Sequence, residues 1–143
     1  MREIYCFDIN PVPAARPRVS RWSTYYPKKY TQFKKDMNAL TSELDIVPFE
    51  GLLSVDIGFF IGMPKSWSKK KKQSLDARYC DNNADVDNYL KAILDSLNEV
   101  VYVDDRQIVE ISARKIYSSK PCIKCKFKII DKGEWWFYPQ EMK

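Results

Sequence analysis

The chain has 143 residues, a formal net charge of +5 and no histidine. Its length and its 45% hydrophobic content predict one packed domain spanning residues 1–143. The absence of histidine excludes Ser-His-Asp and Cys-His catalysis and His-ligated zinc, so a hydrolase with this sequence would use metal-bound water, a carboxylate or a lysine. No apolar run is long enough to cross a membrane, and acidic residues near the start do not suit a signal peptide. We therefore expect a soluble, cytoplasmic protein.

The first half of the chain predicts a strand, a helix and a second strand. Residues 3–9 are rich in β-formers, whereas residues 10–17 contain three prolines and predict a loop. Apolar residues recur at helical spacing over residues 27–44, with Pro27 suited to the first turn. Residues 52–62 then predict a strand in the core.

The second half predicts two helices followed by two strands. Ser66 or Ser68 is a candidate cap for a short basic helix that ends near Ala77. After a polar loop, residues 88–98 carry apolar side chains at i, i+3, i+4 and i+7, which predicts an amphipathic helix. We expect the last strands at 108–117 and 122–130.

This order of elements predicts an α/β fold with a mixed β-sheet of about four strands and helices packed mainly on one face. The tail from about residue 132 is strongly aromatic, with two tryptophans at 135 and 136. We expect it to dock on its own domain; a contact with a second subunit or with DNA is the alternative.

The four cysteines do not form two close pairs, which structural zinc sites usually use. Cys122 and Cys125 are three apart in a predicted strand and would point to opposite faces. We therefore expect buried or half-buried thiols at Cys6, Cys80 and these two positions.

Charges are segregated along the chain. Acidic residues gather between Asp81 and Asp105, and basic residues form separate runs before them. This arrangement suits a nucleic-acid partner, although each basic run alone could be a solvated helix face. Trp22, Tyr25 and Tyr26 could pack against a sugar or an unstacked base. The side chains expected to contact DNA phosphates are Arg16, Arg18, Arg21, Lys28, Lys29, Lys69 and Lys70.

Two acidic pairs flank the third helix. Asp85 and Asp87 precede it, and Asp104 and Asp105 follow about one helix length later. Each has a structural explanation as a helix cap or a turn residue, and Lys91 could be a simple i,i+4 ion-pair partner of Asp87.

Together, the acidic residues indicate a metal site. Carboxylates that share a small volume need a cation, and hard oxygen ligands favour Mg²⁺ or Mn²⁺. Asp85, Asp87 and Asp105 are the predicted ligands, Asp104 is a further candidate ligand, and Lys91 would neutralise charge on a phosphate. Asp105 can meet the first pair only if the returning strand lies beside the start of the helix.

The segments DVDNYLKAILDSL (residues 85–97) and YVDDRQI (residues 102–108) closely resemble the motifs of the RusA-type Holliday-junction resolvases. The loop PVPAARPRVS (residues 11–20) resembles the N-terminal loop of the longer, phage-associated branch of that family. Ala84 stands where many relatives have proline. Glu99 stands where many have glycine, and we expect Asn98 to adopt the left-handed conformation in its place.

The resemblance implies a homodimeric α/β endonuclease that uses Mg²⁺ or Mn²⁺, without an organic cofactor, to resolve four-way DNA junctions by paired symmetric nicks. It implies that Asp85, Asp87, Asp105 and Lys91 are the catalytic residues. The expected location is the cytoplasm of a bacterium or a phage-infected host cell, with a role in DNA recombination and repair.

Two other functions fit parts of the sequence. A DNA-structure-binding protein without catalysis would use the same carboxylates only as caps and turns. A metal-dependent nucleotidyl- or glycosyltransferase would use Asp85 and Asp87 as a metal clamp, but no nucleotide-binding loop is apparent among only four glycines.

Overall fold

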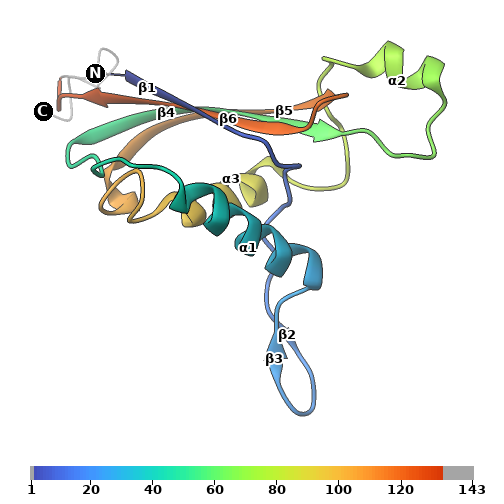
Figure 1. The fold of residues 1–143 in the computed structure, drawn as a ribbon, viewed down its shortest axis with the longest axis horizontal. Helices are drawn as coiled ribbons and strands as arrows, with labels where there is room; N and C mark the ends of the chain where they lie inside the picture. The colour runs from blue at the N-terminus through green and yellow to red at the C-terminus, as the bar shows by residue number, and fades with distance from the viewer. Residues whose placement is uncertain (1, 134–143) are drawn as a thin grey trace, which may run out of the picture.

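The computed structural model describes residues 2–133 and contains one four-stranded sheet with helices on one side (Figure 1). The strand order is β1-β6-β4-β5, in which β4 and β5 are parallel and the other neighbours are antiparallel. This confirms the predicted α/β fold with a mixed sheet. The strands of the sheet are β1 (Arg2–Phe7), β4 (Leu52–Gly62), β5 (Ile108–Ser118) and β6 (Cys122–Ile130). The other elements are β2 (Arg18–Val19), β3 (Thr24–Tyr25), α1 (Lys28–Ser42), α2 (Lys69–Leu75), α3 (Val86–Leu97) and the 3₁₀ helix η1 (Asp105–Gln107).

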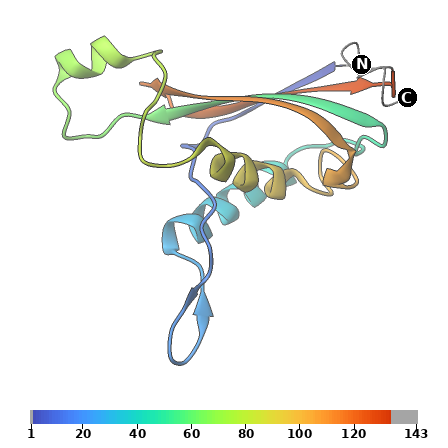
Figure 2. The same ribbon diagram turned by 180° about the vertical axis from the view of Figure 1, so that it is seen from behind.

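The hydrophobic core lies between the sheet and the helices α1 and α3, which run side by side along the same face (Figure 2). Alternate residues of the central strand β4 point into this layer, because successive side chains in a strand face opposite ways. The helices meet them with apolar side chains from their predicted stripes. The fully buried contributors include Leu53, Val55, Ile57 and Phe59 of β4, Met37 of α1, and Ile93 and Leu97 of α3. Each such side chain stabilises the fold by roughly 1.5–3 kcal/mol through burial.

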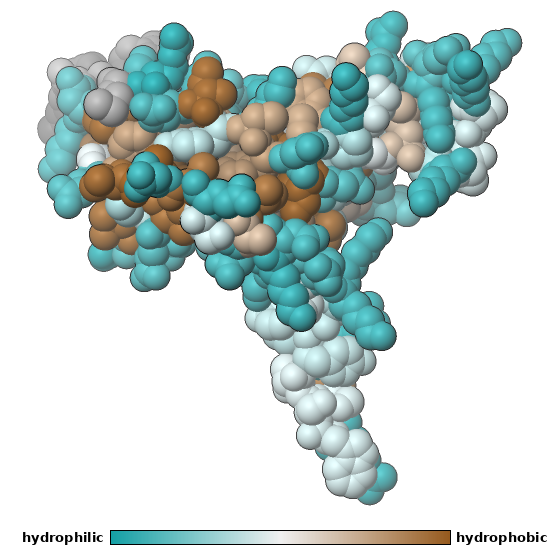
Figure 3. All heavy atoms as spheres, in the orientation of Figure 1, coloured by the Kyte–Doolittle hydropathy of each residue, from teal (hydrophilic) through white to brown (hydrophobic). Residues whose placement is uncertain are grey.

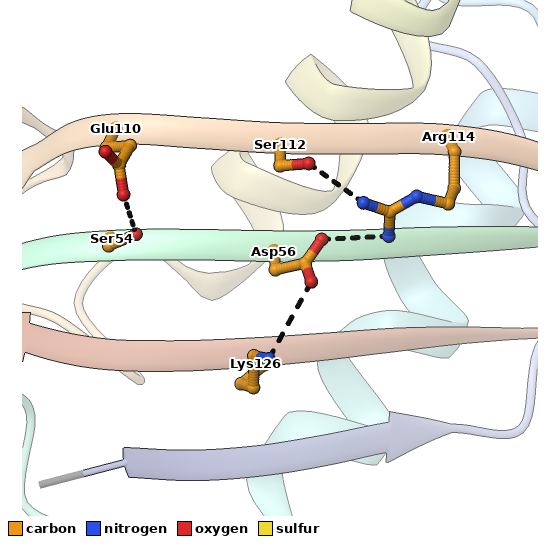
Figure 4. Close-up of polar contacts among 6 residues, drawn as sticks. All are labelled: Ser54, Asp56, Glu110, Ser112, Arg114 and Lys126. Atoms are coloured by element: carbon orange, nitrogen blue, oxygen red, sulfur yellow. Dashed lines mark hydrogen bonds and ion pairs between the residues drawn. The ribbon is translucent and has the colours of Figure 1, made fainter.

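The opposite face of the sheet is polar and carries a small ionic group at its centre (Figure 4). A guanidinium nitrogen of Arg114 lies 2.8 Å from Oδ1 of Asp56, and Lys126 Nζ lies 3.9 Å from Oδ2 of the same carboxylate. Ser54 Oγ donates to Oε1 of Glu110 at 2.5 Å. This alternation of apolar and charged residues explains why the helices cover one face, as predicted.

The connection between the parallel strands β4 and β5 determines where the acidic residues lie. Parallel strands need a long crossover, and here residues 63–107 supply it, including α2 and α3. The loop before α3 runs beside the end of β5, where the backbone N–H of Cys80 donates to the carbonyl of Lys115 at 3.0 Å. Helix α3 then returns to the beginning of β5. The start of α3 therefore lies towards the end of β5, and its end lies towards the beginning of β5.

Several element boundaries differ from the predictions. Strand β1 ends at Phe7, α2 ends at Leu75, and α3 begins at Val86. The cap of α2 is Ser68, one of the two predicted candidates. The hairpin β2–β3 was not predicted. It projects from the body as an arm, defined here as residues 16–26 (Figures 1 and 2).

The end of α3 also differs from the prediction. Asn98 is extended, with φ −62° and ψ 135°, whereas Glu99 itself has a φ of +66°. The expectation for Asn98 was therefore wrong. Glu99 adopts the left-handed conformation because its N–H donates to the carbonyl of Tyr102 at 2.8 Å, which closes the turn after the helix.

The four cysteines are free thiols, and Cys80, Cys122 and Cys125 are buried or half-buried, as expected. The predicted burial of Cys6 was wrong, because its side chain is exposed. Burial raises the pKa of Cys125 well above the usual range for a thiol. Within residues 2–133, no helix combines the length and apolar content that a membrane crossing requires. The predicted docking of the aromatic tail lies outside the described residues.

Candidate active site

The first acidic pair is presented to solvent at the start of α3. Asp85 is the N-cap residue and Asp87 lies in the first turn, and both side chains are exposed. The Asp85 side chain makes no capping hydrogen bond. The ion pairs within residues 2–133 involve only Asp104 and Asp56 as acids, so neither member of this pair is neutralised by a described lysine or arginine. The positive end of the helix dipole still favours both negative charges.

Lys91 lies one helical turn after Asp87 and is exposed. It forms none of the ion pairs in the described part of the chain. The structural explanations for Asp85 as a side-chain cap and for Lys91 as an ion-pair partner therefore do not apply in this structure. An unpaired ammonium group beside two unpaired carboxylates is an arrangement suited to a bound phosphate and a cation.

The loop that leads into Asp85 is anchored by a lysine that the sequence analysis did not identify. Lys115 Nζ, from β5, donates to Oδ1 of Asn82 at 2.8 Å and to the carbonyl oxygen of Ala84 at 2.6 Å. Asn82 Nδ2 in turn donates to the hydroxyl of Tyr89 at 2.8 Å. No local sequence signal reveals these contacts, because Lys115 and the loop are about 30 residues apart in sequence.

A second tyrosine anchors the beginning of the same loop. The hydroxyl of Tyr117 donates to Oδ1 of Asp81 at 2.8 Å. Burial, with the nearby Asp81 carboxylate, raises the pKa of Tyr117 above its usual value, so the hydroxyl remains a donor at physiological pH. The acidic residue Asp81 therefore holds the loop in place.

The N-terminal loop crosses the first turn of α3. The backbone N–H of Ala14 donates to the carbonyl oxygen of Asn88 at 2.9 Å, and Pro11 is buried. This contact places the base of the arm beside the first acidic pair. The basic residues of the arm thus belong to the same end of the molecule as Asp85 and Asp87.

The two members of the second acidic pair, Asp104 and Asp105, differ in their contacts. Asp104 caps η1: its Oδ1 accepts from the N–H of Arg106 at 2.9 Å, and Gln107 Oε1 accepts from the N–H of Asp104 at 2.8 Å. The hydrogen bond from the Arg106 backbone is the main cause that lowers the pKa of Asp104, and the Arg106 side chain lowers it further. Asp105 is exposed and has no ion-pair partner among the described residues. As a metal ligand, Asp105 is therefore better placed than Asp104.

The two acidic pairs do not meet within one chain. Asp85 lies at the beginning of α3, whereas the hydroxyl of Tyr102 bonds the carbonyl of Leu94 near its end and Asp105 follows three residues later. A helix of 12 residues is about 18 Å long. Among residues 2–133, no group of three or more carboxylate or thiol side chains is arranged to hold a metal ion. The returning strand β5 does lie beside the start of α3, but only with its end: Asp105 precedes the beginning of β5 and so lies towards the other end of the helix.

All seven basic side chains predicted to contact DNA are exposed. Arg16, Arg18 and Arg21 lie on the arm, which stands away from the body in Figure 3 and has a surface of mostly intermediate hydropathy there. The turn of the arm is closed by a 2.7 Å bond from the N–H of Ser20 to the carbonyl of Ser23. Trp22 at its tip is 85% exposed, with the guanidinium of Arg21 5.2 Å from its ring centre.

The lysines occupy the first turns of two helices. Lys28 and Lys29 begin α1, and Lys69 and Lys70 begin α2, neither of which has an acidic residue in its first turn. Cations at a helix N-terminus are disfavoured by the helix dipole. Helix stability therefore does not explain these lysines.

Comparison with known proteins identifies the family of the chain. Residues 8–128 match the family model described as Endodeoxyribonuclease RusA. The chain is also 33% identical over 123 residues to YqaN, an uncharacterized protein of Bacillus subtilis strain 168, and the alignment covers 80% of this chain and 87% of the relative. The chain therefore belongs to the RusA family of Holliday-junction endodeoxyribonucleases.

Proposed function

We propose that this chain resolves four-way DNA junctions by paired symmetric nicks, using Mg²⁺ or Mn²⁺ held by Asp85, Asp87 and Asp105. Nucleases of this family depend on a divalent metal ion. The observation that carries the proposal is the pair of exposed, unneutralised carboxylates at the start of α3, with Lys91 one turn away.

The chemistry of these side chains fits a hard divalent cation. Mg²⁺ and Mn²⁺ prefer carboxylate oxygens and are usually held by few protein ligands together with phosphate and water. The metal would supply an activated water and stabilise negative charge on the phosphate. Lys91 would bind a phosphate oxygen and offset the charge that develops there. Lys115 would keep the backbone before Asp85 in place, so that the two carboxylates remain oriented.

Because the two acidic pairs lie at opposite ends of α3, we propose that each metal site is shared between two subunits. A twofold axis across antiparallel copies of α3 would bring Asp85 and Asp87 of one subunit towards Asp105 of the other. The surface around Asp105 supports such a contact: Val103, Val109 and Ile111 are 52%, 55% and 45% exposed. A dimer of this kind contains two equivalent sites, as paired cuts require.

The arm and the first turns of α1 and α2 would bind the DNA backbone. Arginine and lysine side chains there would contact phosphates and orient the junction without reading its sequence. Trp22 and Tyr25, both exposed on the arm, would pack against sugars or unstacked bases.

A junction-cleavage assay with and without Mg²⁺ tests the proposed function. Asp87→Asn should bind a four-way junction as the wild type does but cut it at least about 100-fold more slowly, because a charged ligand is lost. Asp95→Asn is the matched control, since Asp95 is an exposed carboxylate on the same helix. Normal cutting by Asp87→Asn would contradict the role of that residue. A wild-type protein that binds junctions but cuts none at any metal concentration would favour non-catalytic binding.

A further inference from the structure

A cavity of about 390 Å³ opens beside the loop that leads into Asp85. Its walls come from the N-terminal loop, the end of β4, the segment around Trp67, the loop before α3 and the first turn of that helix. None of the proposed metal ligands lines it, and neither does Lys91. The volume is within the range of about 300–1,000 Å³ typical of sites for small organic ligands. The proposed phosphate chemistry therefore leaves a formed cavity without a role.

Aromatic side chains give this cavity flat and rigid walls. Trp67, Tyr89 and Tyr117 all line it. The ring of Trp67 packs edge-on against Tyr117 with 5.2 Å between centroids, and the ring of Tyr89 lies 5.5 Å from Phe59 in the core. Tyr89 and Tyr117 are only 3% and 5% exposed, so the half-buried Trp67 is the ring that offers surface to a planar ligand. Nucleobases bind aromatic side chains by stacking against them.

The cavity is also lined by polar groups that can form further hydrogen bonds. Asn82 is fully engaged by Lys115 and Tyr89, but the side-chain amide of Asn83 makes none of the hydrogen bonds found within residues 2–133. Asn10 Oδ1 accepts from the N–H of Gly62 at 3.0 Å, which leaves its NH₂ group available. Burial raises the pKa of Tyr89, so its hydroxyl also remains a donor. An amide supplies both a donor and an acceptor, as the edge of a nucleobase requires.

The position of the cavity relates it to the proposed cut. Asn83 is two residues before Asp85, so their Cα atoms are at most about 7.6 Å apart. A phosphate bound at Asp85 and Asp87 would place the adjoining nucleotide near the mouth of the cavity. Extruding a base costs unpairing and unstacking free energy, which contacts within the cavity would have to offset. Lys29, which also lines the cavity, would lie near the backbone of that nucleotide.

We infer that this cavity receives the unstacked nucleobase next to the scissile phosphate, and that Asn83 reads its hydrogen-bonding edge. The inference rests on the proposed function, which puts the scissile phosphate at Asp85 and Asp87. It makes Asn83 a determinant of the sequence at which the enzyme cuts, whereas the arm binds DNA without regard to sequence.

The test is the base preference of cleavage on a set of junctions that differ only at the nucleotides flanking the cut. For each variant we would divide the cleavage rate of the fastest-cut junction by that of the slowest-cut junction. A general loss of affinity cancels in this ratio. Asn83→Ala should reduce this ratio by about three- to tenfold, the effect of one ordinary hydrogen bond. Asn38→Ala, which removes an exposed amide from α1, should leave the ratio unchanged. An unchanged ratio in Asn83→Ala would overturn the inference.

An abasic nucleotide at the preferred flanking position gives a second readout. Junction affinity is measured without metal, which keeps the cavity testable if no junction is cut. The abasic substitution should weaken binding by the wild type, and it should weaken binding by Asn83→Ala by a smaller factor. Equal affinity of the wild type for the abasic and the intact junction would contradict the binding of a nucleobase in the cavity, whether or not the protein is a nuclease. Failure of all cutting, with the abasic effect intact, would instead refute the proposed catalysis alone.

Discussion

Lys115 donates a hydrogen bond of 2.6 Å to the carbonyl oxygen of Ala84, the residue immediately before Asp85. The contact joins β5 of the sheet to the loop that presents the first acidic pair. A mobile loop here would move Asp85 and Asp87 relative to any bound phosphate, and errors of about 1 Å in such positions can slow a reaction 100-fold.

Replacing Lys115 with methionine should therefore affect catalysis more than binding. The side chain keeps its length and loses the ammonium group, so the loop loses its anchor. We expect the free energy of unfolding to fall by about 1–3 kcal/mol and the rate of junction cleavage to fall by about 10- to 100-fold. Junction affinity should change little, because the arm is unaffected. Cleavage under single-turnover conditions and a binding titration measure the two quantities separately.

Two further variants separate positioning from general stability. Lys115→Arg retains a charged donor and should recover part of the cleavage rate. Lys128→Met removes an exposed lysine from the outer face of the sheet and should have no effect on cleavage. A Lys115→Met protein that melts earlier but cuts at the wild-type rate well below its melting temperature would show that the lysine is only structural.

The shared metal site makes a prediction about mixed dimers. Asp87→Asn and Asp105→Asn should each be inactive alone. In a dimer that contains one of each, one site carries both changes and the other carries neither. Random exchange of subunits should therefore restore about a quarter of the wild-type nicking rate. The products should be single nicks instead of resolved junctions, which denaturing and native gels distinguish.

The control for this experiment is a mixture of Asp85→Asn and Asp87→Asn. Both changes affect the same half of the site, so every dimer lacks an intact site and the mixture should remain inactive. If the mixture of Asp87→Asn and Asp105→Asn is equally inactive, although subunit exchange is demonstrated by differently tagged chains, the two acidic pairs do not share a metal across the dimer.

Local patterns in the sequence predicted most of the fold. The bounds predicted for β4 and β6 agree with the structure, and those for α3 differ by one or two residues. These elements have strong apolar periodicity, so local spacing was sufficient. The arm lacks such a signal because its strands have two residues each and its turn depends on Ser20 and Ser23. The relation of Asp105 to Asp85 depends on the direction of α3 across the sheet, which residue spacing alone does not determine.

The arm should account for much of the salt dependence of DNA binding. Replacing Arg16 and Arg18 with alanine removes two exposed cations from the arm. Each lost phosphate contact should reduce the slope of log affinity against log salt by about 0.9, which gives a reduction of about 1 to 2. Fluorescence anisotropy with a labelled junction at several salt concentrations measures this slope.

A matched pair of cations controls for the loss of net charge. Arg2 and Lys128 face each other across β1 and β6, away from the arm. Their double alanine variant has the same net charge as the arm variant and should retain a near wild-type slope. Equal slopes for the two double variants would show that the arm makes no specific phosphate contacts.

The left-handed Glu99 predicts a stabilising substitution. A non-glycine residue with φ of +66° costs about 1–2 kcal/mol relative to an ordinary conformation. Glycine removes this cost. However, glycine loses more conformational freedom on folding, which destabilises the folded state by about 0.5–1 kcal/mol. Glu99→Gly should therefore raise the free energy of unfolding by about 0.5–1 kcal/mol, measured by urea denaturation. Glu43 has a φ of −83° at the end of α1, so Glu43→Gly should lower that free energy instead. Both changes remove an exposed glutamate at the end of a helix. Opposite signs of the change in unfolding free energy would therefore isolate the backbone strain. Similar losses of stability in both variants would show that Glu99 is not strained.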